Sequence, residues 1–451
     1  MLQIALVIIT VVLVARLILK GYKAEPVLFV AGLALMFAAF ASNMSILPKG
    51  LNSTGIALLD PFEVMRNLFS SRAADLGLMI MALMGFAKYM DHIGANEAVV
   101  RLVTKPLKRL RSPYVLLFFS YLIASLLQLA IPSATGLAVL LMGTMFPIML
   151  ALGLSPASAA GVIASSLGIA YTPTAIDAIR GSKAVNMDVV EYVLYHQGPA
   201  AIATVLVVGL CHFFWQRHCD KKQGLEPVLA QVSQVKEGKA PLSYAILPML
   251  PIAMAVFSSS LFVKAVKLNI ITIVLICMSI CMLAELVRLR DFKKLCSGFH
   301  HFLEGMGAAF TGVVGLLVAA GTFAHGIKVI GAIDQLIAMA QHLGLPPFAM
   351  AIIFALITLA AAVIMGSGNA PFLAFVELIP DIAAQMGSSA IAMILPMQQA
   401  SHMGRGMSPV SGVVIATASA AKLSPFEVVK RSSLPLLVGF VVHTLIIGLF
   451  Y

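Results

Sequence analysis

Long apolar stretches separated by short polar loops dominate this chain, and most of them are long enough to cross a membrane. Ser112–Ile176 contains 65 residues without one Asp, Glu, Lys or Arg, and Gln335–Val376 contains another 42. A single membrane-spanning helix needs only about 20 predominantly apolar residues. The pattern therefore predicts spans near residues 2–19, 25–42, 73–92, 188–214, 244–263, 269–287, 304–326 and 432–450.

Two apolar stretches are interrupted near their middle by a short polar segment. Residues 113–131 and 137–152 flank Pro132-Ser-Ala-Thr-Gly136. Residues 346–365 and 370–386 flank Gly366-Ser-Gly-Asn in the same way. Each stretch predicts a re-entrant helical hairpin with a polar tip. Non-helical backbone at membrane depth is tolerated only where protein or a water-filled cavity surrounds it, so both tips are expected to lie inside the protein.

Two further stretches, at 156–176 and 390–420, predict discontinuous helices. The first contains Thr172-Pro173 and the second contains Ser408-Pro409. Proline removes a backbone N–H and frees a carbonyl one turn back, so a helix opens at such a position. The freed groups can hold a substrate or a cation, although a proline kink without a ligand would leave the same pattern.

The interrupted segments recur at nearly equal spacing along the chain. Pro173 matches Pro409, Glu191 matches Glu427, and Pro199 matches Pro435, all 236 residues apart. The two hairpin tips match at an offset of 234 residues. Duplicated halves with broken hydrophobic segments at corresponding places indicate the binding site of a secondary transporter.

Composition and charge support a membrane protein with little soluble mass. Of the 451 residues, 60% are hydrophobic and 11% are charged, whereas soluble domains are about a quarter charged. The formal net charge of +11 does not indicate nucleic-acid binding, because the basic residues lie in short loops, as the positive-inside rule describes.

Charge asymmetry gives a predicted orientation. Five basic loops collect 20 Lys and Arg when placed in the cytoplasm, the opposite side collects 8, and Lys88 and Arg405 remain at membrane depth. Both termini then lie outside. The basic loop Arg101–Arg111 is cytoplasmic, whereas its counterpart near Met339–Phe348 is outside, so the two repeats are expected to have inverted topology.

The hairpin tips carry the first group of candidate substrate-binding residues. Helix ends leave backbone N–H groups unpaired and attract anions, and short hydroxyl and amide side chains add donors. The alternative is that small residues only allow close helix packing. The candidates are Ser133, Thr135 and Gly136 in the first tip and Ser367, Gly368 and Asn369 in the second.

The discontinuous helices carry the second group. The segment Ser165–Thr174 matches Ser401–Val410, and each ends in a hydroxyl residue followed by proline. Hydroxyl groups beside an open backbone can donate to an anionic substrate. The candidates are Ser165, Thr172 and Thr174 in the first half and Ser408 and Ser411 in the second.

Arg405 is the strongest single candidate for substrate binding, because it is the only charged residue between Ile382 and Ala421. Gly404 and Gly406 flank it, in the middle of the predicted break. An intramembrane Arg marks function by default, and guanidinium is a natural bidentate partner for a carboxylate. The alternative is a salt bridge to Asp177 or Glu377. These two carboxylates are also the candidates for carrying a coupled proton.

Enzyme signatures are absent from the sequence. There is no GxxxxGK[ST] segment of an ATP-driven pump and no HExxH metal motif, and no cofactor or metal is expected. The spacing argument by itself reaches a carrier for a small anion. A channel or a passive membrane subunit is the rival from a different class.

Several sequence blocks distributed over essentially the whole chain carry a resemblance to a known family. They are Asp75–Met81, His92–Asn96, Ser133–Gly136, Gly366-Ser-Gly-Asn-Ala-Pro-Phe372, Gly404-Arg405, Ser408-Pro-Val-Ser-Gly412 and Ser424–Arg431. Together these blocks resemble the DcuC family of anaerobic C4-dicarboxylate carriers.

The resemblance implies exchange of succinate, fumarate or malate, or proton-coupled succinate efflux, in the inner membrane of a bacterium growing without oxygen. It implies membership of the ion transporter superfamily, whose related members are dimers that work by an elevator mechanism. Sodium-coupled relatives carry Ser-Asn-Thr at both tips. Here the first tip reads Ser133-Ala134-Thr135, so a symmetric pair of sodium sites is not expected. The coupling ion that the resemblance implies is a proton. A carrier for citrate or a short fatty acid is the alternative.

The expected fold is an all-α polytopic membrane protein with two inverted repeats, divided into a scaffold and a transport domain. Residues 1–111 and 244–345 are expected to form the scaffold helices. Residues 112–214 and 346–451 are expected to form the two halves of the transport domain, and residues 215–243 a cytoplasmic linker.

Overall fold

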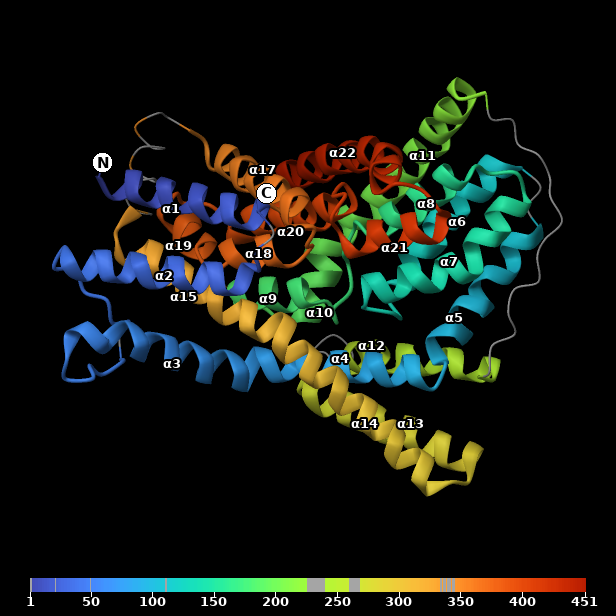
Figure 1. Cartoon of the computed structure of the whole chain (residues 1–451), viewed down its shortest axis with the longest axis horizontal. Coiled ribbons are helices and arrows are strands. Elements are labelled where there is room, and N and C mark those ends of the chain that lie inside the picture. Colours follow the sequence, from blue (N-terminus) through green and yellow to red (C-terminus); the bar gives the residue numbers. More distant parts are fainter. Residues whose placement is uncertain are drawn as a thin grey trace.

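The computed structural model is helical throughout the part of the chain that it describes, and no strand occurs there (Figure 1). It describes residues 2–20, 22–48, 50–109, 112–224, 240–258, 268–332 and 345–451, together with residues 335, 338 and 342. Most of the predicted linker, the end of the predicted span 244–263 and half of the loop 339–348 lie outside these residues.

The first part of the chain forms two single helices, one long interrupted helix and a shorter helix after it. The bounds are α1 (Leu2–Leu19), α2 (Ala24–Ala41), α3 (Asp60–Arg72), α4 (Leu78–His92) and α5 (Ala95–Thr104). A π-helical segment, Ala73–Gly77, joins α3 to α4 without a turn. Short 3-10 helices at Ala57–Leu59 and Lys105–Arg109 precede α3 and follow α5.

The next segment contains the first predicted hairpin and the first predicted broken helix. The bounds are α6 (Pro113–Leu127), α7 (Ala134–Ala151), α8 (Pro156–Ser166), α9 (Ile176–Ala184), α10 (Val189–Glu191) and α11 (Gly198–Lys222). A π-helical segment, Tyr192–Gln197, connects α10 to α11. Helix α11 continues to Lys222, past the expected start of the linker.

The second half repeats this order of elements. Its bounds are α12 (Leu250–Phe257), α13 (Ile270–Leu289), α14 (Phe292–Ala309), α15 (Gly315–Val329), α17 (Pro347–Met365), α18 (Ala370–Phe375), α19 (Ile379–Gln385), α20 (Ala390–Gly406), α21 (Gly412–Ala421) and α22 (Pro425–Phe450). A 3-10 helix, Leu242–Met249, begins the predicted span 244–263 and contains Pro248. Pro251 lies in the first turn of α12, where proline is tolerated.

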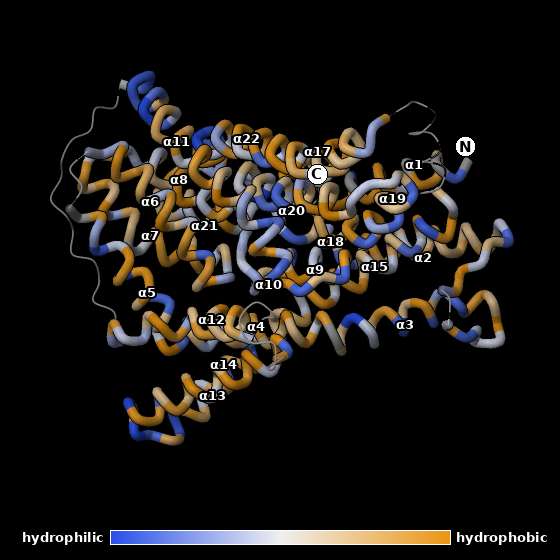
Figure 2. The backbone as a smooth tube through the Cα atoms, turned by 180° about the vertical axis from the view of Figure 1, so that it is seen from behind, coloured by the Kyte–Doolittle hydropathy of each residue, from blue (hydrophilic) through white to orange (hydrophobic). Residues whose placement is uncertain are grey.

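The prediction of a polytopic helical membrane protein is confirmed. Among the described residues, seven helical stretches are long and apolar enough to cross a membrane. Figure 2 shows hydrophobic residues along most of each helix, with hydrophilic residues at the end of α11, at the α13–α14 connection and around the centre of the molecule. The seven stretches are Ala24–Ala41, Ala134–Ala151, Val189–Lys222, Ile270–Leu289, Phe292–Val329, Pro347–Met365 and Pro425–Phe450.

Backbone features recur at the spacing found in the sequence. The π-helical segment Phe310–Val314 joins α14 to α15 as Ala73–Gly77 joins α3 to α4. Positive φ angles end corresponding helices at three matched pairs of positions: Gly94 and Gly331, Gly153 and Gly387, and Asn186 and Lys422. The two parts of the chain therefore share local geometry as well as residue pattern.

Two pairs of long helices cross at glycine residues, where their backbones nearly touch. At the α2–α15 crossing, a Cβ on Gly32 would lie 2.6 Å from the Thr322 carbonyl carbon. At the α4–α14 crossing, a Cβ on Gly305 would lie 2.8 Å from Gly85 Cα. Small residues allow this close approach, which supplies packing energy that lipid tails cannot.

Replacing Gly305 with Ala is expected to destabilise the protein, because the added Cβ would lie 2.7 Å from Lys88 Cβ. Overpacking of this kind costs about 1–3 kcal/mol. The apparent melting temperature of the purified protein in detergent should fall. Gly307 of the same helix has no atom within 4 Å of such a Cβ, so Gly307→Ala is the matched control. Equal melting temperatures for the two variants would contradict the close crossing.

Candidate functional site

Both hairpin tips and both broken helices approach one small cavity of about 60 Å³. Four of the predicted substrate-binding residues line it, and Asp177 and His402 join them. Ala134, the first residue of α7, and Met84 of α4 also lie on its wall. The predicted residues on the wall are Thr172, Thr174, Asn369 and Arg405.

Side chains from other helices satisfy the backbone carbonyls that the first break leaves free. Gln128, at the end of α6, donates to Ser166 O at 2.6 Å, and Ser125 Oγ donates to the same oxygen at 3.2 Å. Arg405 Nη2 donates to Leu167 O at 2.5 Å. Unpaired carbonyls at membrane depth would be costly, so these donors allow the helix to remain open.

Gln399 of α20 binds both backbone groups of Ala170, in the middle of the first break. Its Nε2 donates to Ala170 O at 2.5 Å, and its Oε1 accepts from Ala170 N at 3.2 Å. Gln197 Nε2 also donates to Ala170 O, at 3.0 Å. The glutamine amide replaces a neighbouring peptide group, and it fixes the second half of the chain to the first.

Arg405 lies in the last turn of α20, and the break itself comes after it, at residues 407–411. The expectation that Arg405 lies in the middle of the break is therefore corrected, because the helix continues through Gly404 and Gly406. The guanidinium packs against the second tip, where a Cβ on Gly368 would lie 2.8 Å from Nη1. Among the described residues, Arg405 forms no ion pair, so its charge is available to an anion.

The second tip is fixed by short hydroxyl contacts. Ser367 Oγ accepts from the backbone N–H of Ala370 at 3.1 Å and thereby begins α18. Ser401 Oγ donates to Gly368 O at 2.8 Å. Gly366 has a φ of +66°, and a Cβ there would lie 2.9 Å from Ser411 N. The tip thus packs directly on the second break.

The first tip has a corresponding arrangement. Ser133 Oγ caps α7 by accepting from Gly136 N at 3.2 Å. Thr135 Oγ1 lies near the start of α21, at 3.2 Å from the position of a Cβ on Gly412. Of this tip, Pro132 and Ala134 line the cavity, whereas the predicted residues Ser133, Thr135 and Gly136 are not among its lining residues.

Three predicted hydroxyl residues are buried away from the cavity wall. Ser165 Oγ is 2.6 Å from His212 Nε2 and donates to Val162 O at 3.0 Å. Ser411 Oγ caps α21 by accepting from Val414 N at 3.5 Å. Ser408 Oγ accepts from Val410 N at 3.4 Å, as Thr172 Oγ1 accepts from Thr174 N. Their observed contacts are to protein groups.

Asp177 is held by polar groups of α20. Its Oδ2 lies 3.0 Å from His402 Nε2 and accepts from Gln398 Nε2 at 2.5 Å. Tyr192 donates in turn to Gln398 Oε1 at 2.7 Å. Asp177 is 1% exposed and His402 is 6% exposed. The pair joins the first broken helix to the second.

Glu377, the other proton-coupling candidate, lies outside this cavity. Its Oε1 is 2.7 Å from Arg72 Nη2 and 2.9 Å from Arg180 Nη2. It lines a separate cavity of about 320 Å³ together with His325 and Lys328. Two guanidinium groups thus contact this carboxylate, one from α3 and one from α9.

The glutamines of this site and His402 are not among the residues that the sequence predicts to bind substrate. Gln398, His402 and Arg405 are spaced by four and three residues, which places them on one face of α20. That spacing was a usable signal. Gln128, by contrast, is a lone amide at the end of an apolar run, and only the folded chain shows which carbonyl it contacts.

A larger cavity of about 410 Å³ lies where α9 and α10 face α4, α12 and α13. Lys183 and Asp188 are its charged lining residues. It contains none of the predicted substrate-binding residues. The smaller cavity is the better candidate, because polar groups from four interrupted segments converge there.

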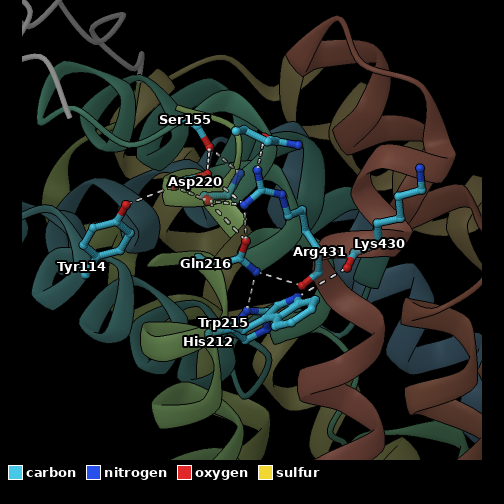
Figure 3. A network of polar contacts seen from close by, with 10 residues as sticks. Tyr114, Ser155, His212, Trp215, Gln216, Asp220, Lys430 and Arg431 are labelled. Carbon is cyan, nitrogen blue, oxygen red and sulfur yellow. Dashed lines mark hydrogen bonds and ion pairs between the residues drawn. The ribbon is translucent and has the colours of Figure 1, made fainter. Parts of the chain in front are cut away.

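A second buried polar network joins α8, α11 and α22 (Figure 3). Arg431 Nη1 is 2.8 Å from Asp220 Oδ1, and these side chains are 4% and 2% exposed. Ser155 and Ser158 donate to the Asp220 carboxylate, each at 2.8 Å. Gln216 Nε2 donates to Arg431 O at 2.8 Å. Every partner comes from the predicted transport-domain halves or the extension of α11.

Comparison with known proteins assigns the chain to a family. The family model described as C4-dicarboxylate anaerobic carrier, DcuC, matches residues 2–451. The chain belongs to the DcuC family. Its relatives include the anaerobic C4-dicarboxylate transporter DcuC of Escherichia coli strain K12, which is 44% identical over 96% of this chain and 94% of that protein. The probable DcuC of Vibrio cholerae is 42% identical over 99% and 97%.

Family membership confirms the expectation of a carrier and excludes the enzyme class for this DcuC protein. Solved structures show a similar fold at low identity. The YdaH transporter of Alcanivorax borkumensis has a TM-score of 0.67 at 13% identity, covering 95% of this chain and 98% of that one. Neisseria gonorrhoeae MtrF has a TM-score of 0.57 at 15% identity, covering 94% and 95%.

Replacing Arg431 with Ala is expected to destabilise the protein strongly, because Asp220 would remain buried without its counter-charge. Removal of one partner of a buried pair costs about 3–5 kcal/mol. Thermal unfolding in detergent measures the loss. Lys430→Ala is the matched control, since that side chain is exposed. An Arg431→Ala melting temperature equal to that of Lys430→Ala would show that the network contributes little.

Proposed function

We propose that this protein is an inner-membrane secondary transporter of C4-dicarboxylates such as succinate, fumarate and malate. The observation that carries the proposal is Arg405, a guanidinium without an ion-pair partner among the described residues, on the wall of the cavity between the tips and the breaks. A cation in such a place attracts a carboxylate. Family membership supplies the substrate class, because the curated relatives are named as C4-dicarboxylate transporters.

In this proposal one substrate carboxylate pairs with Arg405. The other carboxylate takes donors from Asn369, from Thr172 and Thr174, and from the N-terminal end of α7, whose first residue lines the cavity. Helix N-termini favour anions through their unpaired N–H groups. The hydroxyl oxygens of Ser133 and Ser367 accept hydrogen bonds from backbone N–H groups. Their O–H hydrogens are therefore still available for donation to the substrate.

Transport requires motion, because the cavity is smaller than the roughly 300–1,000 Å³ of typical ligand sites. We propose that residues 112–214 and 346–451 move as one body against a scaffold of residues 1–111 and 244–345, as in an elevator. Contacts of Arg405, Gln399 and His402 bind the two moving halves together. Met84 of the scaffold closes one wall of the cavity.

Two ion pairs cross the proposed boundary between scaffold and moving body. Arg72 of α3 contacts Glu377 at 2.7 Å, and Lys328 of α15 contacts Asp381 at 2.6 Å. Both join the scaffold to the second hairpin. Movement of the hairpin would exchange these pairs for others or for water, so they favour the conformation seen here.

Inverted topology of the two repeats is part of the proposal. The matched positive-φ pairs and the matched π-helical segments support a duplicated fold. The hydrophilic ends of α11 and of the α13–α14 connection lie at one end of the molecule in Figure 2, as a cytoplasmic surface requires. Both termini are then periplasmic. The homodimer that the resemblance implies also remains a proposal.

A coupled proton is proposed as well, and Asp177 is its better carboxylate candidate. Asp177 lines the substrate cavity, whereas Glu377 is held by two arginines outside it. A charge change at Asp177 would act directly on a bound anion. The same change at Glu377 would act on the contact between the hairpin and the scaffold.

Replacing Arg405 with Ala is expected to abolish dicarboxylate transport while the protein is still produced and folded. Among the described residues on the cavity wall, Arg405 is the one cation that is charged regardless of pH, and the change removes it. Uptake of labelled fumarate into liposomes containing the purified variant measures the effect. Arg66→Ala is the matched control, since that side chain is exposed and paired with Glu63. Uptake by Arg405→Ala at the wild-type rate would contradict the assigned role of Arg405 in substrate binding.

Fumarate uptake into liposomes is expected to accelerate when the lumen contains succinate, because a carrier returns faster with substrate bound. Unlabelled malate should compete, whereas citrate and butyrate should not. Uptake that is indifferent to internal succinate would favour a channel. Effective competition by citrate or butyrate would move the substrate assignment to another anion.

A further inference from the structure

The substrate cavity holds three ionisable groups, and their formal charges cancel when His402 is neutral. They are the guanidinium of Arg405, the carboxylate of Asp177 and the imidazole of His402. A dicarboxylate adds two negative charges to this neutral cluster. Uncompensated charge in a buried site is expensive, so substrate binding should draw a proton into the cavity.

The contacts of Asp177 indicate where that proton goes. Gln398 Nε2 donates to Asp177 Oδ2 at 2.5 Å, and His402 Nε2 lies 3.0 Å from the same oxygen. Donors aimed at a carboxylate favour its ionised form. His402 is the titratable group in contact with that carboxylate, and each imidazole nitrogen can carry a proton. The geometry therefore points to His402 as the group that takes up the added proton.

The second nitrogen of His402, Nδ1, has no contact comparable to that of Nε2. Both ring nitrogens are buried and neither forms a hydrogen bond within the described part of the chain, but Nε2 lies 3.0 Å from Asp177 Oδ2. In the neutral ring with its N–H directed at Asp177, Nδ1 can only accept, and it repels a carboxylate. Protonation makes Nδ1 a donor while Nε2 keeps its contact with Asp177. The charged ring can then join Asp177 to a substrate carboxylate.

We propose that the His402–Asp177 pair binds the coupled proton, on the His402 imidazole, and that the charged imidazole completes the dicarboxylate site beside Arg405. This inference rests on the proposed function and assigns the residue through which substrate and proton affect each other. Binding linkage is reciprocal, so fumarate raises proton affinity as much as the proton raises fumarate affinity.

Other titratable groups around the His402–Asp177 pair do not couple proton binding to substrate binding in this way. Tyr192, on the segment after α10, contacts Gln398 instead of Asp177. Arg180, one turn along α9, is paired with Glu377. On α20 the next charged residue is Arg405 itself. The parts of α4, α7 and the second tip on the cavity wall contribute Met84, Ala134 and Asn369, which do not titrate.

Calorimetric titration of the purified full-length protein with fumarate tests the proposal. Fumarate keeps both carboxylates ionised between pH 6 and 8, so protons exchanged there belong to the protein. Titrations in phosphate and in Tris, whose ionisation enthalpies differ, report the number of protons taken up. The wild type is expected to take up about one proton per fumarate, and its affinity should fall by up to roughly tenfold per pH unit as pH rises.

His402→Gln is expected to bind fumarate with affinity independent of pH and without proton uptake, because glutamine can donate to Asp177 but cannot titrate. His325→Gln is the matched control. His325 contacts Ile46 O at 2.7 Å outside the cavity, so its variant should behave as the wild type does. Proton uptake retained in His402→Gln, or lost in His325→Gln alone, would overturn the assignment.

Asp177→Asn provides an independent test that does not depend on the folding of the first variant. Without the carboxylate, the charged imidazole is less stable, so the pH dependence of fumarate binding should shift to lower pH. A purely structural role for the pair would leave that dependence in place. Fumarate binding by the wild type without proton uptake contradicts the inference alone, whereas absence of fumarate binding contradicts the proposed function and the inference with it.

Discussion

Open backbone at membrane depth must find hydrogen-bond partners inside the protein, because lipid supplies none. In this chain the first break exposes the carbonyls of Ser166, Leu167 and Ala170. Side chains from the end of α6, from the π-helical segment before α11 and from α20 satisfy them. The hydrogen-bonding requirement of one short segment therefore constrains the positions of those helices. The hairpin tips, the cavity and the charged residues all depend on this arrangement.

The same contacts that stabilise the break also prepare the site. Arg405 donates to Leu167 O through one nitrogen, and its guanidinium covers Gly368 of the second tip. Structural and substrate-binding roles thus belong to one side chain. Because Arg405, Gln399 and His402 each connect α20 to the first broken helix region, the two halves of the proposed moving body are joined at the substrate site. Motion that preserves these contacts is rigid-body motion, whereas the ion pairs of Arg72 and Lys328 lie at the boundary that must rearrange.

Sequence reasoning succeeded where a local rule leaves few alternatives. A proline after a hydroxyl residue predicted the position of each break, and small polar residues inside apolar runs predicted the position of each tip. The sequence was less informative about which neighbour each side chain faces. Ser165 was expected to face substrate, yet its hydroxyl contacts His212 on α11. Arg405 was expected inside the break and lies in the last helical turn before it. A helical pattern gives the angular spacing of side chains but does not say which neighbour lies on each face.

The sequence by itself determined the membrane environment, the helical class, the interrupted segments and their repetition, because hydrophobic length and proline position act locally. It also determined that Arg405 is an exceptional charge, since few ionisable residues occur at membrane depth. Only the tertiary structure decided that Asp177 contacts His402 and that Glu377 forms ion pairs with two arginines. It also decided that Gln399 forms hydrogen bonds with the backbone of Ala170. These pairings join residues more than 190 positions apart, and their energies depend on distances that no local pattern encodes.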